Sequence, residues 1–129
     1  SQSIQYMGKK EILIIDDSNT NLVLLESLLR KNGYIVHSAL NAKEGIKTMQ
    51  QSVPDLIYLD LVMPEVDGLK FIQMIRERDE WKDVPVVIIS AVSDKKVIRQ
   101  SIEMGVIDYI TKPIDIEKII SLTNGIFEN

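Results

Sequence analysis

The chain has 129 residues, of which 45% are hydrophobic and 26% are charged, and its net charge is −4 at neutral pH. This length and composition fit one globular domain, which we expect over residues 10–129 after a tail or linker over residues 1–9. The acidic balance argues against direct nucleic-acid binding, and the lack of cysteine excludes disulfides and thiolate chemistry. No apolar stretch approaches the roughly 20 residues that span a bilayer. We therefore expect a cytoplasmic protein without a secretory signal or a membrane partner.

The first half of the chain alternates short apolar runs with amphipathic stretches. Residues 12–15 form an Ile-Leu-Ile-Ile run that is apolar on both faces, which is typical of a strand buried in a parallel sheet. Leucines at helical spacing follow, and their pattern ends at Gly33. A second strand is expected over residues 34–38, and Asn41 with Glu44 resembles the capping box that opens a helix.

The second half continues the alternation. Residues 56–59 and 86–89 are the third and fourth expected strands, and a helix is expected after each. Ser93 is expected to cap the fourth helix, and a fifth strand is expected over residues 107–110. Asp115 is expected to cap the last helix, whose inward-facing residues would be Ile116, Ile119, Ile120 and Ile126. Five strand–helix units in alternation predict an α/β fold with a five-stranded parallel sheet and helices on both faces.

Polar residues stand where the expected strands end. Asp16 and Asp17 follow the first strand, Asp60 the third, Ser90 the fourth and Lys112 the fifth. The carboxyl ends of parallel strands form one edge of an open α/β sheet, and ligands bind in the crevice at that edge. We therefore expect three carboxylates, a hydroxyl and an ammonium group to converge there.

This set of groups predicts phosphoryl chemistry that depends on a divalent cation. Three carboxylates at contact distance repel one another, and a hard cation with oxygen ligands, Mg²⁺ or Mn²⁺, relieves the repulsion. Lys112 supplies a compact positive charge for Asp60 or for a phosphoryl oxygen, and Ser90 supplies a donor. Together they describe a carboxylate nucleophile poised to attack phosphorus.

Motifs at the strand ends resemble those of the receiver domain of response regulators from Lys10 to about Phe127. They are Ile15-Asp16-Asp17, the Leu-Asp-Leu-Val-Met-Pro run over 59–64, Asp67-Gly68, Ile89-Ser90-Ala91 and the Asp-Tyr-Ile-Thr-Lys-Pro run over 108–113. The resemblance implies a doubly wound (βα)5 sheet with strand order 2-1-3-4-5. It also implies a two-component signalling switch that catalyses only its own phosphorylation and slow dephosphorylation, rather than an enzyme acting on a separate metabolite.

The same resemblance assigns roles to residues of the predicted crevice. Asp60 would be the phospho-acceptor, and Mg²⁺ would be bound by Asp17 directly, by Asp16 through water or as a second ligand, by Asp60, and by the main-chain carbonyl of Val62. Lys112 would contact the phosphoryl group.

Two further features follow from the resemblance. The Lys112–Pro113 bond would be cis, although only about 5–6% of X–Pro bonds are cis in folded proteins. Ser90 and Tyr109 would form a switch pair, in which Ser90 turns toward the phosphoryl oxygen and Tyr109 moves into the space that it leaves.

The resemblance also implies the partners. A histidine kinase or histidine phosphotransfer protein would supply the phosphoryl group. An effector domain or protein would bind the face made by the fourth helix, the fifth strand and the fifth helix, where phosphorylation can also drive homodimerisation. Val106 and Ile107 make this surface more apolar than is usual in the family.

Two valines bear on the lifetime of the phosphoryl group. Residues two positions beyond Asp60 and two beyond Ser90 lie near the path of attacking water in similar domains, and here they are Val62 and Val92. Because neither side chain can orient water, we expect slow dephosphorylation.

Two kinds of alternative function can be compared with this interpretation. An aspartyl phosphatase of the haloacid-dehalogenase type needs a second Asp two residues after the nucleophile, where this chain has Val62. A nucleotide-binding function is disfavoured because the chain contains neither of the glycine-rich phosphate-binding motifs. The other alternative is a pseudo-receiver, an interaction module that works without phosphorylation, against which the intact acidic set argues.

Overall fold

The computed structural model describes residues 8–128, and the expected tail over residues 1–9 lies for the most part outside this range. Five parallel strands form one sheet in the order β2-β1-β3-β4-β5, which confirms the predicted (βα)5 fold and its strand order. The strands are β1 (Glu11–Ile15), β2 (Ile35–Ala39), β3 (Leu56–Leu59), β4 (Val86–Ser90) and β5 (Asp108–Thr111). The helices are α2 (Asn19–Lys31), α3 (Ala42–Gln51), α4 (Gly68–Arg76), α5 (Lys95–Glu103) and α6 (Ile116–Phe127).

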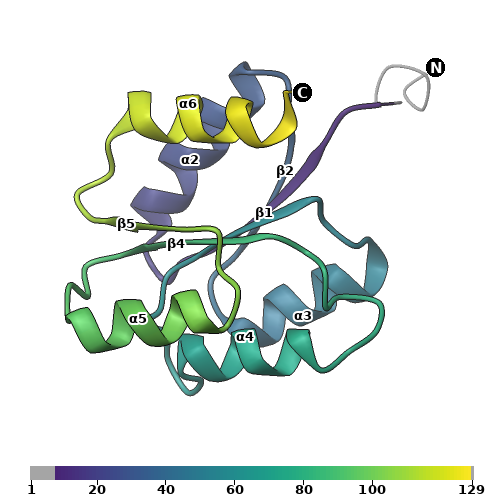
Figure 1. The fold of residues 1–129 in the computed structure, drawn as a ribbon. Helices are drawn as coiled ribbons and strands as arrows, with labels where there is room; N and C mark the ends of the chain where they lie inside the picture. The colour runs from purple at the N-terminus through teal and green to yellow at the C-terminus, as the bar shows by residue number, and fades with distance from the viewer. Residues whose placement is uncertain (1–7, 129) are drawn as a thin grey trace.

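Helices cover both faces of the sheet, with α2 and α6 on one side and α3, α4 and α5 on the other (Figure 1). The two sides of β1 show why its sequence is apolar throughout. Leu13 and Ile15 belong to the core cluster beneath α3, α4 and α5, whereas Ile12 and Ile14 belong to the cluster beneath α2 and α6. Successive side chains of a strand point to opposite faces, so a strand covered on both sides must be apolar at every position.

Each helix begins at a polar residue whose side chain accepts a hydrogen bond from a backbone N–H of the first turn. These residues are Ser18, Asn41, Asp67, Asp94 and Asp115. The predicted caps at Asn41 and Asp115 are confirmed. The prediction of Ser93 was wrong by one residue, because the adjacent Asp94 has the extended backbone of a cap and its carboxylate accepts from the N–H of Lys96.

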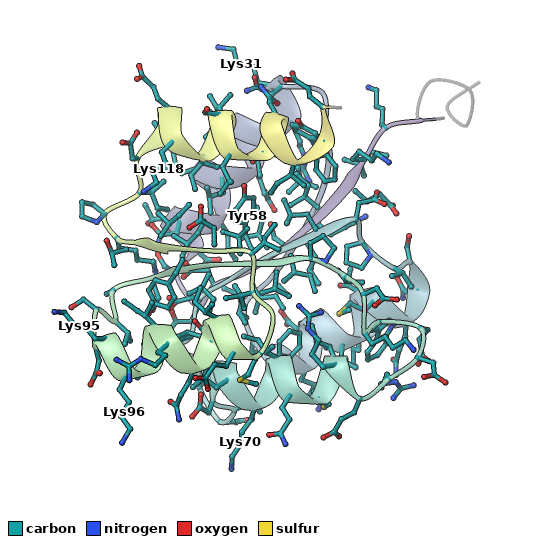
Figure 2. The ribbon with its side chains drawn as sticks, in the orientation of Figure 1. Lys31, Tyr58, Lys70, Lys95, Lys96 and Lys118 are labelled. Atoms are coloured by element: carbon teal, nitrogen blue, oxygen red, sulfur yellow. The ribbon has the colours of Figure 1, made fainter. Side chains whose placement is uncertain are left out.

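One predicted core residue of the last helix was also wrong. Ile119 is fully buried, but the side chain of Ile116 is 43% exposed. Ile116 is the first residue of α6, and the buried residues of this helix, Ile119 and Thr123, lie further along it. Inside the same layer, Tyr58 of β3 lies between the sheet and α6, and its hydroxyl is hydrogen-bonded to Thr123 (Figure 2).

The opposite layer is tied together by Arg76 at the end of α4. Its guanidinium donates to the carbonyl oxygens of Lys82 and Val84 before β4, at 3.0 and 2.7 Å, and to that of Met104 after α5, at 3.3 Å. Within residues 8–128, no helix is both long and apolar enough to cross a membrane.

Candidate functional site

The carboxylates of Asp16, Asp17 and Asp60 meet at the carboxyl edge of the sheet. One oxygen of each lies within 4.8 Å of the others, which confirms the convergence expected from the strand ends. Asp16 and Asp60 are only 2% and 5% exposed, whereas Asp17 is exposed. Buried carboxylates this close together are unfavourable unless a positive charge neutralises them.

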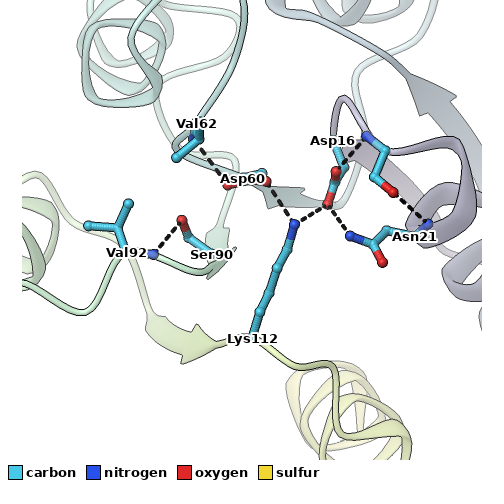
Figure 3. Close-up of polar contacts among 8 residues, drawn as sticks. Asp16, Asn21, Asp60, Val62, Ser90, Val92 and Lys112 are labelled. Atoms are coloured by element: carbon cyan, nitrogen blue, oxygen red, sulfur yellow. Dashed lines mark hydrogen bonds and ion pairs between the residues drawn. The ribbon is translucent and has the colours of Figure 1, made fainter.

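Lys112 provides that positive charge from the loop after β5. Its ammonium nitrogen lies 2.8 Å from Oδ2 of Asp60 and 3.0 Å from Oδ2 of Asp16, so it bridges the two buried acids (Figure 3). Burial alone would lower the pKa of Lys112, but its hydrogen bonds to Asp60 and Asp16 outweigh burial and raise the pKa above its ordinary value. Lys112 is therefore charged throughout the neutral range. Its peptide bond to Pro113 is cis, as predicted.

The loop after β3 holds Asp60 in place. Oδ1 of Asp60 accepts a hydrogen bond of 3.0 Å from the N–H of Val62, and the N–H of Gly68 donates to the carbonyl of Leu61 across the loop. A Cβ atom at Gly68 would lie 2.6 Å from Cα of Leu61, so the close approach of α4 to this loop requires glycine. Glu65, within the same loop, has a φ of 70°, a conformation that glycine adopts more readily.

Asp16 is held by donors from the turn that follows β1. The N–H of Ser18 donates to its Oδ1 at 2.9 Å, and the side-chain amide of Asn21 donates to its Oδ2 at 3.3 Å (Figure 3). This contact of Asn21 was not predicted from the sequence. An amide five residues after a strand-end acid, in the first turn of the next helix, is the signal that could have indicated it.

Ser90 and Tyr109 meet at the loop between β4 and α5. Oγ of the buried Ser90 accepts from the N–H of Val92 at 3.2 Å, and the hydroxyl of Tyr109 donates to the carbonyl of Val92 at 2.5 Å. Burial raises the pKa of Tyr109 above its ordinary value. Both side chains of the predicted pair thus contact one loop, next to the acidic cluster.

The donor set at this edge fits Mg²⁺. The three carboxylates offer only oxygen ligands, and the site is open to solvent at Asp17. Both features match the preference of a small hard cation that keeps several bound waters. A hollow of about 650 Å³ lies at the opposite edge of the sheet beside Arg76 and Met104. We assign the chemistry to the carboxylate crevice because the charged groups converge there.

Fold and site together define a class of protein: a doubly wound α/β domain with a carboxylate cluster and a lysine at the carboxyl edge of its sheet. Comparison with known proteins agrees. A family model described as the response regulator receiver domain matches residues 12–124. The chain therefore belongs to the receiver domain family of response regulators, whose fold is that of signalling switches rather than of metabolic enzymes, and whose acidic pocket binds Mg²⁺.

Individual relatives extend this result. The chain is 31% identical to the protein PilH of Pseudomonas aeruginosa over 115 residues, covering 89% of this chain and 95% of PilH. It is 36% identical to the transcriptional regulator RpaA of Synechocystis over 110 residues, covering 85% of this chain but 46% of RpaA. A two-component response regulator from Clostridium difficile superposes with a TM-score of 0.87 at 26% identity, covering 94% of this chain and 98% of that structure.

Proposed function

We propose that the domain is a phosphorylation switch that accepts a phosphoryl group on Asp60 in a reaction that requires Mg²⁺. The observation that carries this proposal is the arrangement of Asp60, which is buried among two further carboxylates and bonded to Lys112. A purely structural acid would not be placed where two like charges raise its energy.

Each residue of the crevice has a distinct task in this reaction. An oxygen of Asp60 attacks phosphorus in line, a P–O bond to Asp60 forms, and the bond between phosphorus and the donor's leaving group breaks. When bound there, Mg²⁺ would supply positive charge that offsets the carboxylates and the transferring phosphoryl group. Asp17, Asp16, Asp60 and the carbonyl of Val62 are the proposed ligands, and Mn²⁺ can take the same place. Lys112 moves from Asp60 to a phosphoryl oxygen.

The state of Asp60 is reported through Ser90 and Tyr109. Both contact Val92 in the unphosphorylated domain. The Ser90 oxygen now accepts from the N–H of Val92, and a phosphoryl oxygen on Asp60 offers the Ser90 hydroxyl a charged acceptor for its own proton. When Ser90 turns toward that oxygen, the loop at Val92 and the side chain of Tyr109 must adjust.

The phosphoryl group is long-lived in this proposal. Val62 is 55% exposed and Val92 is half-buried, and their backbone N–H groups are bonded to Asp60 and Ser90, so apolar side chains stand beside the crevice. Replacing either valine with Asn or Glu is expected to shorten the phosphoryl half-life, because these side chains can orient an attacking water. An unchanged half-life in both variants would refute this part of the proposal.

Partners follow from the family, since receiver domains of response regulators interact with histidine kinases and effector domains. For this chain we propose a histidine kinase or phosphotransfer protein as donor. The proposed effector or dimer surface comprises α5, β5 and α6. Its support is a set of exposed isoleucines, one beside or on each element: Ile102, Ile107 and Ile116, at 50%, 50% and 43% exposure.

The test is incubation of the protein with Mg²⁺ and acetyl phosphate, followed by intact mass measurement. We expect the mass of one phosphoryl group to be added to the wild type and to Asp79→Asn, since the Asp79 side chain is 97% exposed and far from the crevice in sequence. Asp60→Asn should gain none. The pseudo-receiver would be favoured if the wild type gains no phosphoryl group and if beryllofluoride with Mg²⁺ also leaves its spectra unchanged.

A further inference from the structure

The two acids after β1 are held very differently. Asp16 is buried, and its carboxylate accepts from three groups: the N–H of Ser18 on Oδ1, and both the Lys112 ammonium and the Asn21 amide on Oδ2. Asp17 is exposed, and its side chain has no hydrogen bond or ion pair to any part of the chain that the structure describes. The adjacent carboxylates therefore differ in how many lone pairs they can still offer.

Asn21 differs from the other donor on Oδ2 in having its backbone fixed at the start of a helix. Its backbone N–H is bonded to Oγ of Ser18, the residue that caps α2, and the N–H of Ser18 in turn donates to Asp16. Asp16, Ser18 and Asn21 thus form a closed set of hydrogen bonds at the start of α2. Lys112, by contrast, sits on a flexible stem and must turn toward the phosphoryl group during the proposed reaction.

We propose that Asn21 is a positioning residue that fixes the orientation of the Asp16 carboxylate for cation binding. When Lys112 moves away, the Asn21 amide is the side chain that still restrains Oδ2. Asp16 would thereby be kept in the orientation in which it serves the cation, while Asp17 keeps its carboxylate oxygens available as ligands. This inference rests on the proposed Mg²⁺ dependence of the site.

The side-chain hydrogen bonding of Asn21 is confined to the acidic cluster. Within the described chain, its side chain has one hydrogen-bond partner, which is Asp16. Asn19, two residues earlier in the same turn, is exposed and has no side-chain hydrogen bond among the described residues. Asn19 is therefore a matched control of the same residue type.

The experiment is a titration of the unphosphorylated protein with Mg²⁺. Binding is measured by calorimetry and by the NMR resonances of the backbone amides of Asp17 and Asp60. Loss of a group that orients a metal ligand usually weakens metal binding by about 10- to 100-fold. Because the contact of Asn21 with Asp16 is long, at 3.3 Å, we expect Asn21→Ala to weaken Mg²⁺ binding by about 10-fold. Asn19→Ala should bind Mg²⁺ like the wild type. At saturating Mg²⁺, Asn21→Ala should be phosphorylated at the wild-type rate, so that the Mg²⁺ requirement changes and the maximal rate does not.

A second variant tests the same contact with the opposite sign. Asn21→Asp places a fourth carboxylate against Oδ2 of Asp16, so the metal-free protein should melt at a lower temperature than Asn19→Asp. Mg²⁺ should then raise its melting temperature more than it raises that of the wild type. Melting curves in a chelator also separate a loss of folding from a loss of binding.

The outcomes distinguish this inference from the proposed function. If the wild type binds Mg²⁺ and Asn21→Ala binds it equally well or more tightly, Asn21 is not a positioning residue and the proposed function still stands. If Asn21→Asp behaves as Asn19→Asp does in both melting experiments, the inference is equally overturned. If the wild type itself binds no Mg²⁺, both the inference and the proposed function fail.

Discussion

Replacing Lys112 with methionine tests how the two buried acids are stabilised. The change removes the ammonium group that lies 2.8 Å from Asp60 and 3.0 Å from Asp16, while it keeps an unbranched side chain of similar length. Removing one partner of a buried ion pair costs about 3–5 kcal/mol, because the remaining charge stays buried without compensation. The Lys112 side chain is 19% exposed, so solvent screens the site in part and we expect about 3 kcal/mol. For a domain of this size that corresponds to a melting temperature lower by about 10 °C.

The assay is urea and thermal unfolding of the metal-free protein in a chelator, monitored by the fluorescence of Trp81, which is 2% exposed in the native domain. Lys96→Met is the control, because the Lys96 side chain projects from α5 into solvent (Figure 2). Adding Mg²⁺ should recover more stability in Lys112→Met than in the wild type, since the cation then supplies the missing positive charge. If Lys112→Met is as stable as Lys96→Met without metal, the reasoning about the buried carboxylates is refuted.

The pH dependence of this effect follows from the raised pKa of Lys112. A basic group whose pKa is higher in the folded state stabilises the fold fully below its unfolded pKa, about 10.4, and loses that contribution as the pH rises through its folded value. The difference in stability between Lys112→Met and the wild type should therefore be constant from pH 7 to pH 9, roughly, and shrink in more alkaline solution.

Three further changes are expected elsewhere in the domain. Arg76→Met should lower the free energy of unfolding by about 2–3 kcal/mol in urea, because it leaves carbonyls before β4 and after α5 without their charged donor; a loss below about 0.5 kcal/mol would contradict this. Glu65→Gly should leave stability unchanged or raise it by up to about 1 kcal/mol, whereas Glu65→Val should lower it, because φ is 70° there. Burial raises the pKa of Tyr58 to about 12, so its stabilising contribution, present below about pH 10, should be lost as the pH rises through 12, and Tyr58→Phe should lack that alkaline loss.

The fold and most of the site could be predicted because they depend on local patterns. Buried parallel strands are apolar at every position, so the residue at which each apolar run stops marks the carboxyl edge of the sheet. Asp60 and Lys112 are 52 residues apart in the sequence, yet each directly follows the last residue of a strand and they are in contact. Topology alone was enough to bring them together.

The remaining features depend on side-chain packing that leaves no periodic signal. Arg76 reaches distant carbonyls only because α4 packs close to the end of α5 and to the loop before β4. No sequence pattern specifies these distances. The amide of Asn21 reaches Asp16 only in one side-chain orientation on the first turn of α2. The Ser93 error has a simpler cause, since two adjacent residues could both cap α5 and the backbone selected Asp94.

The central claim is that Asp60 carries the phosphoryl group, and chemical mapping tests it most directly. The protein, phosphorylated with acetyl phosphate and Mg²⁺, is reduced with borohydride, which converts an aspartyl phosphate to homoserine, and is then digested and sequenced by mass spectrometry. The account predicts homoserine at position 60 alone, and none in Lys112→Met samples prepared without Mg²⁺. Homoserine at position 16 or 17 with an unmodified Asp60, or no modified carboxylate in a fully folded wild type, would contradict it.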